Sequence, residues 1–334
     1  MVVFYLKHTF MKCSDSRVSD KTFYKTFART NPSDKLVVRS LLVLLKYYRW
    51  SKFSIISEGN NPYMSIAQNL EKQVSNNTNF TINHNGIKYF PNQYICCEDK
   101  QKCCRDIFSD VVDETYKSTR VYVFFGRLAD LIELMTKLQM RKLLDNGEYV
   151  IIYIDLEAYS ESTAYRYFWR MDMRQHLVDT TLKAAGSLLV IVPTPPQAAG
   201  YAEFEENVRK YNFEEPFSFP NKLPYPKHIT EFAAYLYDSV ILYAEALAKT
   251  LDEDGDPRNG TNIIQKIISR GMYQSVTGAW MHIDDNGDVE GNYTVLALQP
   301  TPPNLTLKGL GGERLSHLML PMAQFQYDEE TGEP

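Results

Sequence analysis

The residues of this chain that could carry chemistry form no familiar catalytic pattern. The sequence contains no glycine-rich phosphate loop, no G-x-S-x-G nucleophile turn and no H-E-x-x-H zinc motif. No two histidines stand close enough to form a motif; they are His8, His84, His176, His228, His282 and His317. We therefore predict that this chain has no catalytic site and needs no cofactor.

Two acidic runs, at residues 252–256 and 284–288, imitate calcium-binding loops. After the first, Pro257 stands where an EF-hand loop requires glycine, and Ile263 stands where it requires a bidentate glutamate. In the second run, Val289 takes the glycine position. Both runs are therefore predicted to be turns, and no metal site is expected.

The cysteines favour a disulfide-stapled loop over a zinc site. Four of them form two adjacent pairs around a polar stretch, without the C-x2-C spacing or the nearby histidine of a structural zinc site. Because the total is odd, one thiol is left over, either free or bridged to a partner chain. The disulfide candidates are Cys13, Cys96, Cys97, Cys103 and Cys104.

Five Asn-x-Thr sequons favour a secreted origin. All lie in polar, turn-rich sequence, whereas the proline in Asn31-Pro32-Ser33 excludes that site from glycosylation. The predicted N-glycosylation sites are Asn76, Asn79, Asn259, Asn292 and Asn304.

Length and charge limit the remaining classes. A chain of 334 residues suggests two domains, and 36 basic against 41 acidic residues give a net charge of −5, which argues against a nucleic-acid-binding surface. The first residues lack the long apolar run of a signal peptide, and the apolar stretch 232–248 carries Asp238 and Glu245. Any membrane attachment would therefore depend on segments outside this sequence.

Short buried strands alternate with helical patterns along the chain. We expect strands at 53–57, 120–125, 149–154 and 188–192, and helices at 36–48, 128–144, 202–211 and 229–251. This alternation predicts an α/β fold with doubly wound parallel sheets. The Pro193-Thr194-Pro195-Pro196 joint cannot continue a helix or strand, so it is the candidate linker.

Several segments, in order, resemble one family. The sequence SDKTFYKTFARTNPSD at 19–34, followed by WSKF at 50–53, resembles the centre of type I periplasmic-binding-protein-like receptor ectodomains. EYVIIYID at 148–155 is similar to a strand of receptor guanylate cyclases. LYDSV at 236–240, NGTNI at 259–263 and VTGAWMHID at 276–284 resemble the natriuretic-peptide-receptor branch of the ANF receptor family, especially its invertebrate members.

The resemblance implies a two-lobed fold with ligand bound in or beside the cleft. Lobe 1 would comprise residues 1–30 and 194–295, without the first part that the family has, and lobe 2 would comprise residues 31–193. Residues 296–334 would be a return segment and a flexible tail.

The resemblance also implies where ligand-binding residues lie, namely in loops at the carboxyl ends of strands. The candidates are Ser14, Ser16, Glu58, Asn60 and Arg127, and an ordinary capped turn remains the alternative for the two serines. The vertebrate receptors carry a lobe 2 disulfide at positions near Tyr63 and Asp145, where this chain has no cysteine. Its staple would therefore differ, and Cys13 bridged to the 96–104 loop is one possibility.

These implications lead to an extracellular, peptide-hormone-binding region of a membrane receptor guanylate cyclase that works as a homodimer. The full-length parent would signal through cGMP from the plasma membrane. Two alternatives are a soluble or clearance-type binding protein and a receptor region for amino acids or other small molecules. An α/β enzyme with an unrecognised site is a further alternative.

Overall fold

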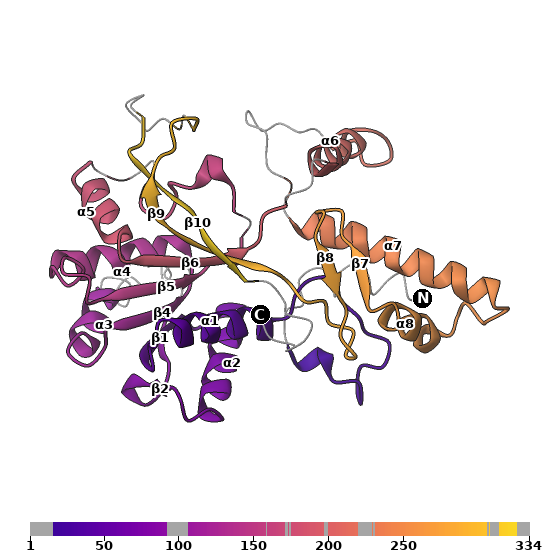
Figure 1. The fold of residues 1–334 in the computed structure, drawn as a ribbon, viewed down its shortest axis with the longest axis horizontal. Coiled ribbons are helices and arrows are strands. Elements are labelled where there is room, and N and C mark those ends of the chain that lie inside the picture. Colours follow the sequence, from indigo (N-terminus) through magenta and orange to yellow (C-terminus); the bar gives the residue numbers. More distant parts are fainter. Residues whose placement is uncertain are drawn as a thin grey trace. The chain divides into compact units, whose positions relative to one another are not determined.

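The fold comes from a computed structural model that describes residues 16–91, 106–157, 159–170, 173, 175–196, 200–219, 229, 231–305, 307 and 314–325. The chain forms two compact units (Figure 1). Unit 1 comprises Met1–Leu36 and Pro195–Gly291, and unit 2 comprises Val37–Thr194 and Asn292–Pro334. The chain passes between units inside the predicted proline joint, between Thr194 and Pro195.

Unit 2 is built on a mixed sheet of eight strands among the described residues. Its order is β10-β9-β6-β5-β4-β1-β2. β3 also pairs with β1, at residues that follow those paired with β2. The strands from β2 to β6 run parallel, as the alternation of strands and helices predicts. They are β1 Lys52–Glu58, β2 Thr81–Ile82, β3 Lys88–Phe90, β4 Val121–Phe125, β5 Val150–Ile154 and β6 Leu188–Pro193.

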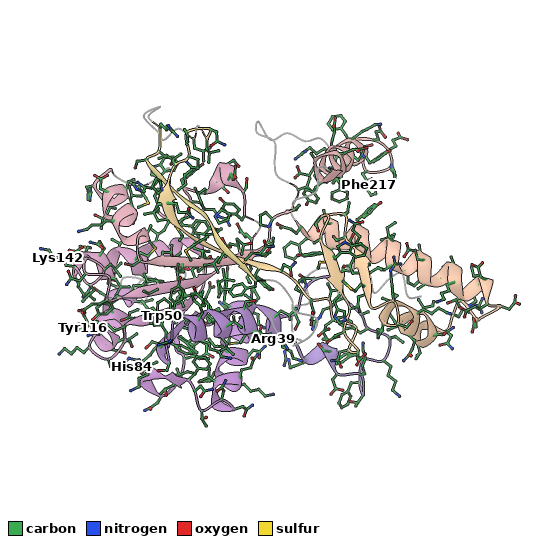
Figure 2. All side chains as sticks on the ribbon, viewed as in Figure 1. Arg39, Trp50, His84, Tyr116, Lys142 and Phe217 are labelled. Carbon is green, nitrogen blue, oxygen red and sulfur yellow. The ribbon has the colours of Figure 1, made fainter. Side chains whose placement is uncertain are left out.

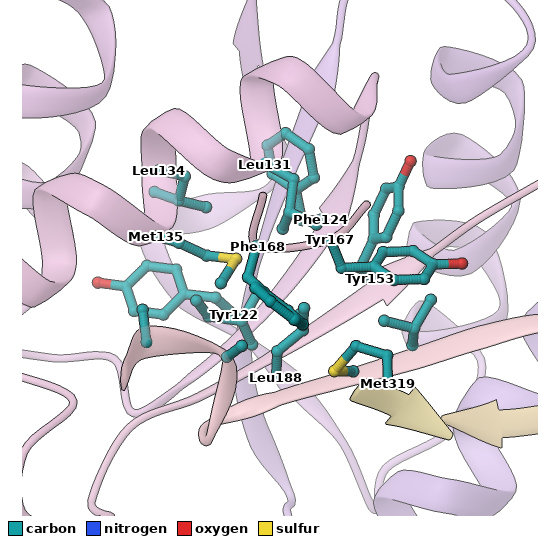
Figure 3. Packing of buried hydrophobic residues seen from close by; sticks show 14 of the residues in the cluster. Tyr122, Phe124, Leu131, Leu134, Met135, Tyr153, Tyr167, Phe168, Leu188 and Met319 are labelled. Atoms are coloured by element: carbon teal, nitrogen blue, oxygen red, sulfur yellow. The ribbon is translucent and has the colours of Figure 1, made fainter. Parts of the chain in front are cut away.

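Helices cover both faces of this sheet. Alternate strand residues such as Ile56, Phe124 and Tyr153 pack into one core with residues of α3, α4 and α5, and Figure 3 shows its centre. The buried residues of α2 lie outside that core although α2 packs on β1 and β4, so α2 covers the opposite face. The helices of this region are α1 Asp34–Tyr47, α2 Tyr63–Ser75, α3 Ile107–Thr115, α4 Leu128–Met140 and α5 Gln175–Ala185, with short 3-10 turns η3 Asn83–Asn85 and η5 Glu161–Thr163.

Two strands lie in the region expected to hold the return segment and the flexible tail. β9, Tyr293–Pro300, pairs antiparallel with β6, and β10, His317–Phe325, pairs antiparallel with β9. β10 was not predicted from the sequence because it contains Pro321, and proline is rare inside strands. β10 lies at the end of the strand order, where Pro321 does not interrupt a ladder on both sides, and the register shifts between Pro321 and Ala323.

Unit 1 contains helices and a small hairpin. α7, Glu231–Asp252, buries Ala234, Asp238, Leu242 and Ala246 at every fourth position, as an amphipathic helix must. Its core is shared with α8 and the hairpin. The other elements are η2 Ser16–Ser19, α6 Gly200–Phe213, α8 Gly260–Ile268, β7 Met272–Gln274 and β8 Trp280–His282.

A buried ion pair ties the start of unit 1 to its end. Arg29 Nε lies 2.8 Å from Asp288 Oδ1, and the guanidinium also donates to Asp288 Oδ2 at 2.9 Å. Ser19 completes the network, since its hydroxyl donates to Asp288 Oδ2 at 2.6 Å. The Arg29 side chain is fully buried, so both charges depend on each other for solvation.

We predict that Arg29→Ala destabilises unit 1 by about 3–5 kcal/mol, because it leaves the Asp288 carboxylate buried without its cation. Urea unfolding followed by circular dichroism measures the change. Arg270→Ala is the matched control: Arg270 also pairs with a carboxylate, that of Glu245, but both side chains are exposed. The control should lose less than about 1 kcal/mol. Equal losses in the two variants would contradict the prediction.

Candidate functional site

Three neighbouring parallel strands of unit 2 end level with one another. Strand pairing places Ser57 opposite Phe125, and Phe124 opposite Tyr153. The row that follows at the carboxyl ends of β1, β4 and β5 therefore consists of Glu58, Gly126 and Asp155. Open α/β sheets place ligands at this edge.

Glu58 lies in a buried charge network with the start of α4. Its carboxylate Oε2 is 3.4 Å from Arg127 Nε, and Arg127 Nε donates to Asp130 Oδ2 at 3.1 Å. Glu58 Oε2 has no hydrogen-bond partner within the described residues, and the Glu58 side chain is only 3% exposed. Burial raises the pKa of Asp130 to about 6, although the Arg127 guanidinium acts in the opposite direction.

Asp155 forms a second charge network one strand further along. Its Oδ2 accepts from Arg166 at 2.5 Å and from the Tyr167 hydroxyl at 2.8 Å. Burial raises the pKa of Asp155, while Arg166 counteracts the rise. The same guanidinium donates to the exposed Glu157 at 2.9 Å, so that Arg166 joins two carboxylates. Tyr167 also packs edge-on against Tyr153, with ring centroids 6.3 Å apart (Figure 3).

Tyr63, the first residue of α2, is affected by charges of both networks. Burial, followed by the negative charges of Asp155, Glu58 and Glu157, raises the pKa of the Tyr63 hydroxyl to about 12. The hydroxyl is therefore neutral at physiological pH. We call Glu58, Tyr63, Arg127, Asp130, Asp155, Glu157, Arg166 and Tyr167 the carboxyl-edge cluster.

Close packing beneath the cluster fixes the loop after β4. A Cβ atom on Gly126 would come within 2.8 Å of the Phe90 ring and 3.0 Å of the Phe124 ring. Phe90 and Phe124 stack with centroids 5.6 Å apart, and the Phe90 carbonyl accepts from the Gly59 N–H at 2.9 Å. Glycine at 126 lets the backbone lie on these rings and so places Arg127 beside Glu58.

The opposite edge of the sheet is different in character. There Trp50 stacks on Tyr48 with ring centroids 4.5 Å apart, and a ring nitrogen of His84 lies 3.2 Å from the Thr119 hydroxyl. Figure 2 labels Trp50 and His84. The ion pair between Arg120 and Glu148 at this edge is exposed on both sides. Buried charge in the sheet therefore gathers at the carboxyl ends of the strands.

The cluster carries a surplus of negative charge. Its four carboxylates, Glu58, Asp130, Asp155 and Glu157, face the two guanidinium groups of Arg127 and Arg166. When all of these groups are ionised, the carboxylates exceed the guanidinium groups by two charges among the described residues of the cluster.

The structure places three of the predicted ligand-binding residues at this edge, and it does not describe the side chains of the other two. Glu58 and Arg127 are in contact, and exposed Asn60 lies in the turn between β1 and α2. Arg127 was predicted to bind ligand, and the carboxylates that it meets in this structure are those of Glu58 and Asp130. Ser14 and all five cysteines lie outside the described residues, and of Ser16 only the backbone is described.

Sequence reasoning missed most of the cluster. Asp155 follows a buried strand just as Glu58 does, so the same rule identifies it. Arg166 and Tyr167 lie in an irregular segment without periodicity, and nothing in their spacing indicates that they turn back to Asp155. Tyr63 carried no signal beyond its position at the start of a helix.

Of the acidic runs that imitate calcium loops, the first begins with the last residue of α7 and the second is a turn. Asp284 Oδ1 accepts from the N–H groups of Asn286 and Asp288, at 2.9 and 2.8 Å, and Asp288 is committed to Arg29. Within the described part of the chain, no group of three or more histidine, cysteine or acidic residues is arranged to hold a metal ion. The same residues include no helix long and apolar enough to cross a membrane.

A mostly parallel sheet with helices on both faces, in a chain that crosses between two units, is the fold of a periplasmic-binding-protein-like ligand-binding region. The family model described as "Receptor family ligand binding region" matches residues 4–301. The chain therefore belongs to the receptor family ligand-binding region.

The most informative relatives are receptors of invertebrates. The chain is 37% identical to the receptor-type guanylate cyclase Gyc76C and 30% identical to guanylate cyclase 32E, both of Drosophila melanogaster, in each case over 96% of its length. It is 26% identical, again over 96%, to the speract receptor of Strongylocentrotus purpuratus. It spans only 22%, 25% and 29% of these three relatives.

The raised pKa of Asp130 predicts a pH dependence of stability. Between the ordinary value of 3.8 and about 6, the folded state keeps a proton that the unfolded chain has released. The contribution of Asp130 is therefore most favourable below about pH 4 and is lost as the pH rises through about 6. Asp130→Asn imitates the protonated acid. Over that pH range, its free energy of unfolding should therefore rise relative to that of the wild type by up to about 3 kcal/mol.

Urea unfolding at several pH values measures this difference. Asp179→Asn is the control, because Asp179 is exposed on α5 of the same unit. If the difference in free energy of unfolding between wild type and Asp130→Asn stays constant with pH, the raised pKa of Asp130 is contradicted.

Proposed function

We propose that this chain is the extracellular ligand-binding region of a membrane receptor guanylate cyclase, and that its ligand, a peptide, binds at the carboxyl-edge cluster. In the full-length receptor, ligand would change the arrangement of a homodimer and thereby the production of cGMP. The proposal includes a location on the outer face of the plasma membrane.

One observation carries this proposal above all. Within a family of ligand-binding regions, the buried charge of the unit 2 sheet is concentrated at the strand ends where ligands bind in α/β folds. The support for cGMP output comes from the relatives, which are named as guanylate cyclases. The support for a peptide comes from relatives such as the rat atrial natriuretic peptide receptor 2, 29% identical over 54% of this chain.

The test uses the full-length transcript expressed in cultured cells. A peptide fraction from tissue of the same animal should raise cGMP, and prior digestion of the fraction with protease should abolish the response. Transcripts that never continue into membrane and cyclase segments would favour a soluble or clearance-type binding protein. A response that survives digestion would favour a small-molecule ligand.

We predict that Arg127→Ala abolishes ligand-evoked cGMP at equal surface expression, because Glu58 and Asp130 then lose their shared cation. Arg120→Ala is a matched control: Arg120 precedes β4 as Arg127 follows it, and its ion pair with Glu148 is exposed. Asn60→Ala alters an exposed residue of the same edge and should weaken the response without affecting folding. Responses equal to wild type in both Arg127→Ala and Asn60→Ala would place the ligand elsewhere.

An extracellular location predicts a glycan at Asn259. This side chain is exposed, and it caps α8 by accepting from the Asn262 N–H at 3.2 Å. A glycan attaches to Nδ2 and leaves Oδ1 free to keep this cap, so modification and helix are compatible. By contrast, Asn292 is half-buried at the start of β9, and its carbonyl accepts from Thr194.

Peptide mapping of the chain secreted from insect or mammalian cells, with and without enzymatic deglycosylation, tests this prediction. Asn31 serves as the internal control, because the proline that follows it blocks the modification. An unmodified Asn259 in the secreted protein would count against the assignment.

A further inference from the structure

We infer that the carboxyl-edge cluster recognises an organic cation, an ammonium or guanidinium group of the ligand. This inference rests on the proposed function and specifies the ligand chemistry of that same site. Its basis is the combination of a net negative charge with a buried carboxylate oxygen that lacks a hydrogen-bond donor.

The charge balance supplies the attraction. Arg127 is shared between Glu58 and Asp130, and Arg166 between Asp155 and Glu157, so each guanidinium serves two carboxylates. A third cation would relieve the surplus on both networks. An anionic ligand group would instead have to displace a carboxylate from one of the arginines, at the cost of leaving that carboxylate unpaired.

The hydrogen-bond inventory supplies the second argument. Glu58 Oε2 is buried and accepts no hydrogen bond from any described residue, and its ion-pair contact with Arg127 is long, at 3.4 Å. A buried acceptor without a donor lowers stability, and a ligand that brings N–H donors removes that penalty. Ammonium and guanidinium groups bring both donors and the missing charge.

Glu157 is the carboxylate of the cluster that an incoming cation can reach from solvent. The Glu157 side chain is 79% exposed, whereas the side chains of Glu58 and Asp155 are 3% and 5% exposed. The Tyr63 hydroxyl feels all three of these negative charges. A cation that pairs with Glu157 is therefore also attracted by the two buried carboxylates.

The test measures the melting temperature of the 334-residue chain in the presence of small probes at constant ionic strength. At about 10 mM, N-ethylguanidinium should raise the melting temperature by roughly 2–4 °C, whereas its neutral isostere N-ethylurea should not. Glu157→Gln should remove most of the shift, and Glu58→Gln should remove it as well. Glu161→Gln is the matched control, because Glu161 is exposed nearby and makes no ion pair with the cluster.

Three results would overturn the inference. One is an equal response to N-ethylurea, another is a full response in Glu157→Gln, and the third is stabilisation by calcium alone or by propionate in place of the organic cation. Glu157 is exposed, so its variant tests the inference even if Glu58→Gln fails to fold. Each of these results would leave the proposed receptor function standing, because that function is tested separately by cGMP production in the full-length protein.

Discussion

The structure of unit 2 depends on one constraint, which is that charged residues at the ends of buried strands must find cations before they can stay ionised. Glu58 and Asp155 complete strands that are otherwise apolar, and their carboxylates are almost wholly removed from water. An isolated carboxylate in such a place would take up a proton. Arg127 and Arg166 place a cation beside each of these carboxylates, so the loops that carry these arginines must return to the sheet edge.

This constraint explains the local architecture of the edge. The loop after β4 needs a glycine at 126 because the rings of Phe90 and Phe124 leave no room for a Cβ atom. The segment after β5 instead runs through the 3-10 turn η5 before Arg166 reaches back to Asp155. Two different routes therefore give the same result, a guanidinium held beside the carboxylate at the end of a strand.

The strands and helices of unit 2 were predictable because each follows a hydrophobic period that burial enforces. The expected strand at 120–125 and the observed β4, Val121–Phe125, differ by one residue. Glu58 and Arg127 were predictable as site residues for a related reason, since polar residues at the ends of buried parallel strands meet at one edge. Arg166 was not predictable, because its position depends on an irregular segment whose path is set by tertiary contacts. β10 was missed because Pro321 suppresses the strand pattern, although proline is tolerated at a sheet edge.

A structural role alone does not account for so many charges at this edge. When a buried ion pair is replaced by apolar groups of similar volume, the protein is often equally or more stable. The pair of Glu58 and Arg127 is therefore not needed to stabilise this end of the core. The edge at the amino ends of the same parallel strands contains an aromatic stack of Trp50 on Tyr48 and an exposed ion pair. Because the two edges close the same sheet, the physical need for closure is similar at both. The difference between them is therefore best explained by what must bind at the carboxyl ends, where a pre-ordered field of fixed charges orients an incoming ligand before contact.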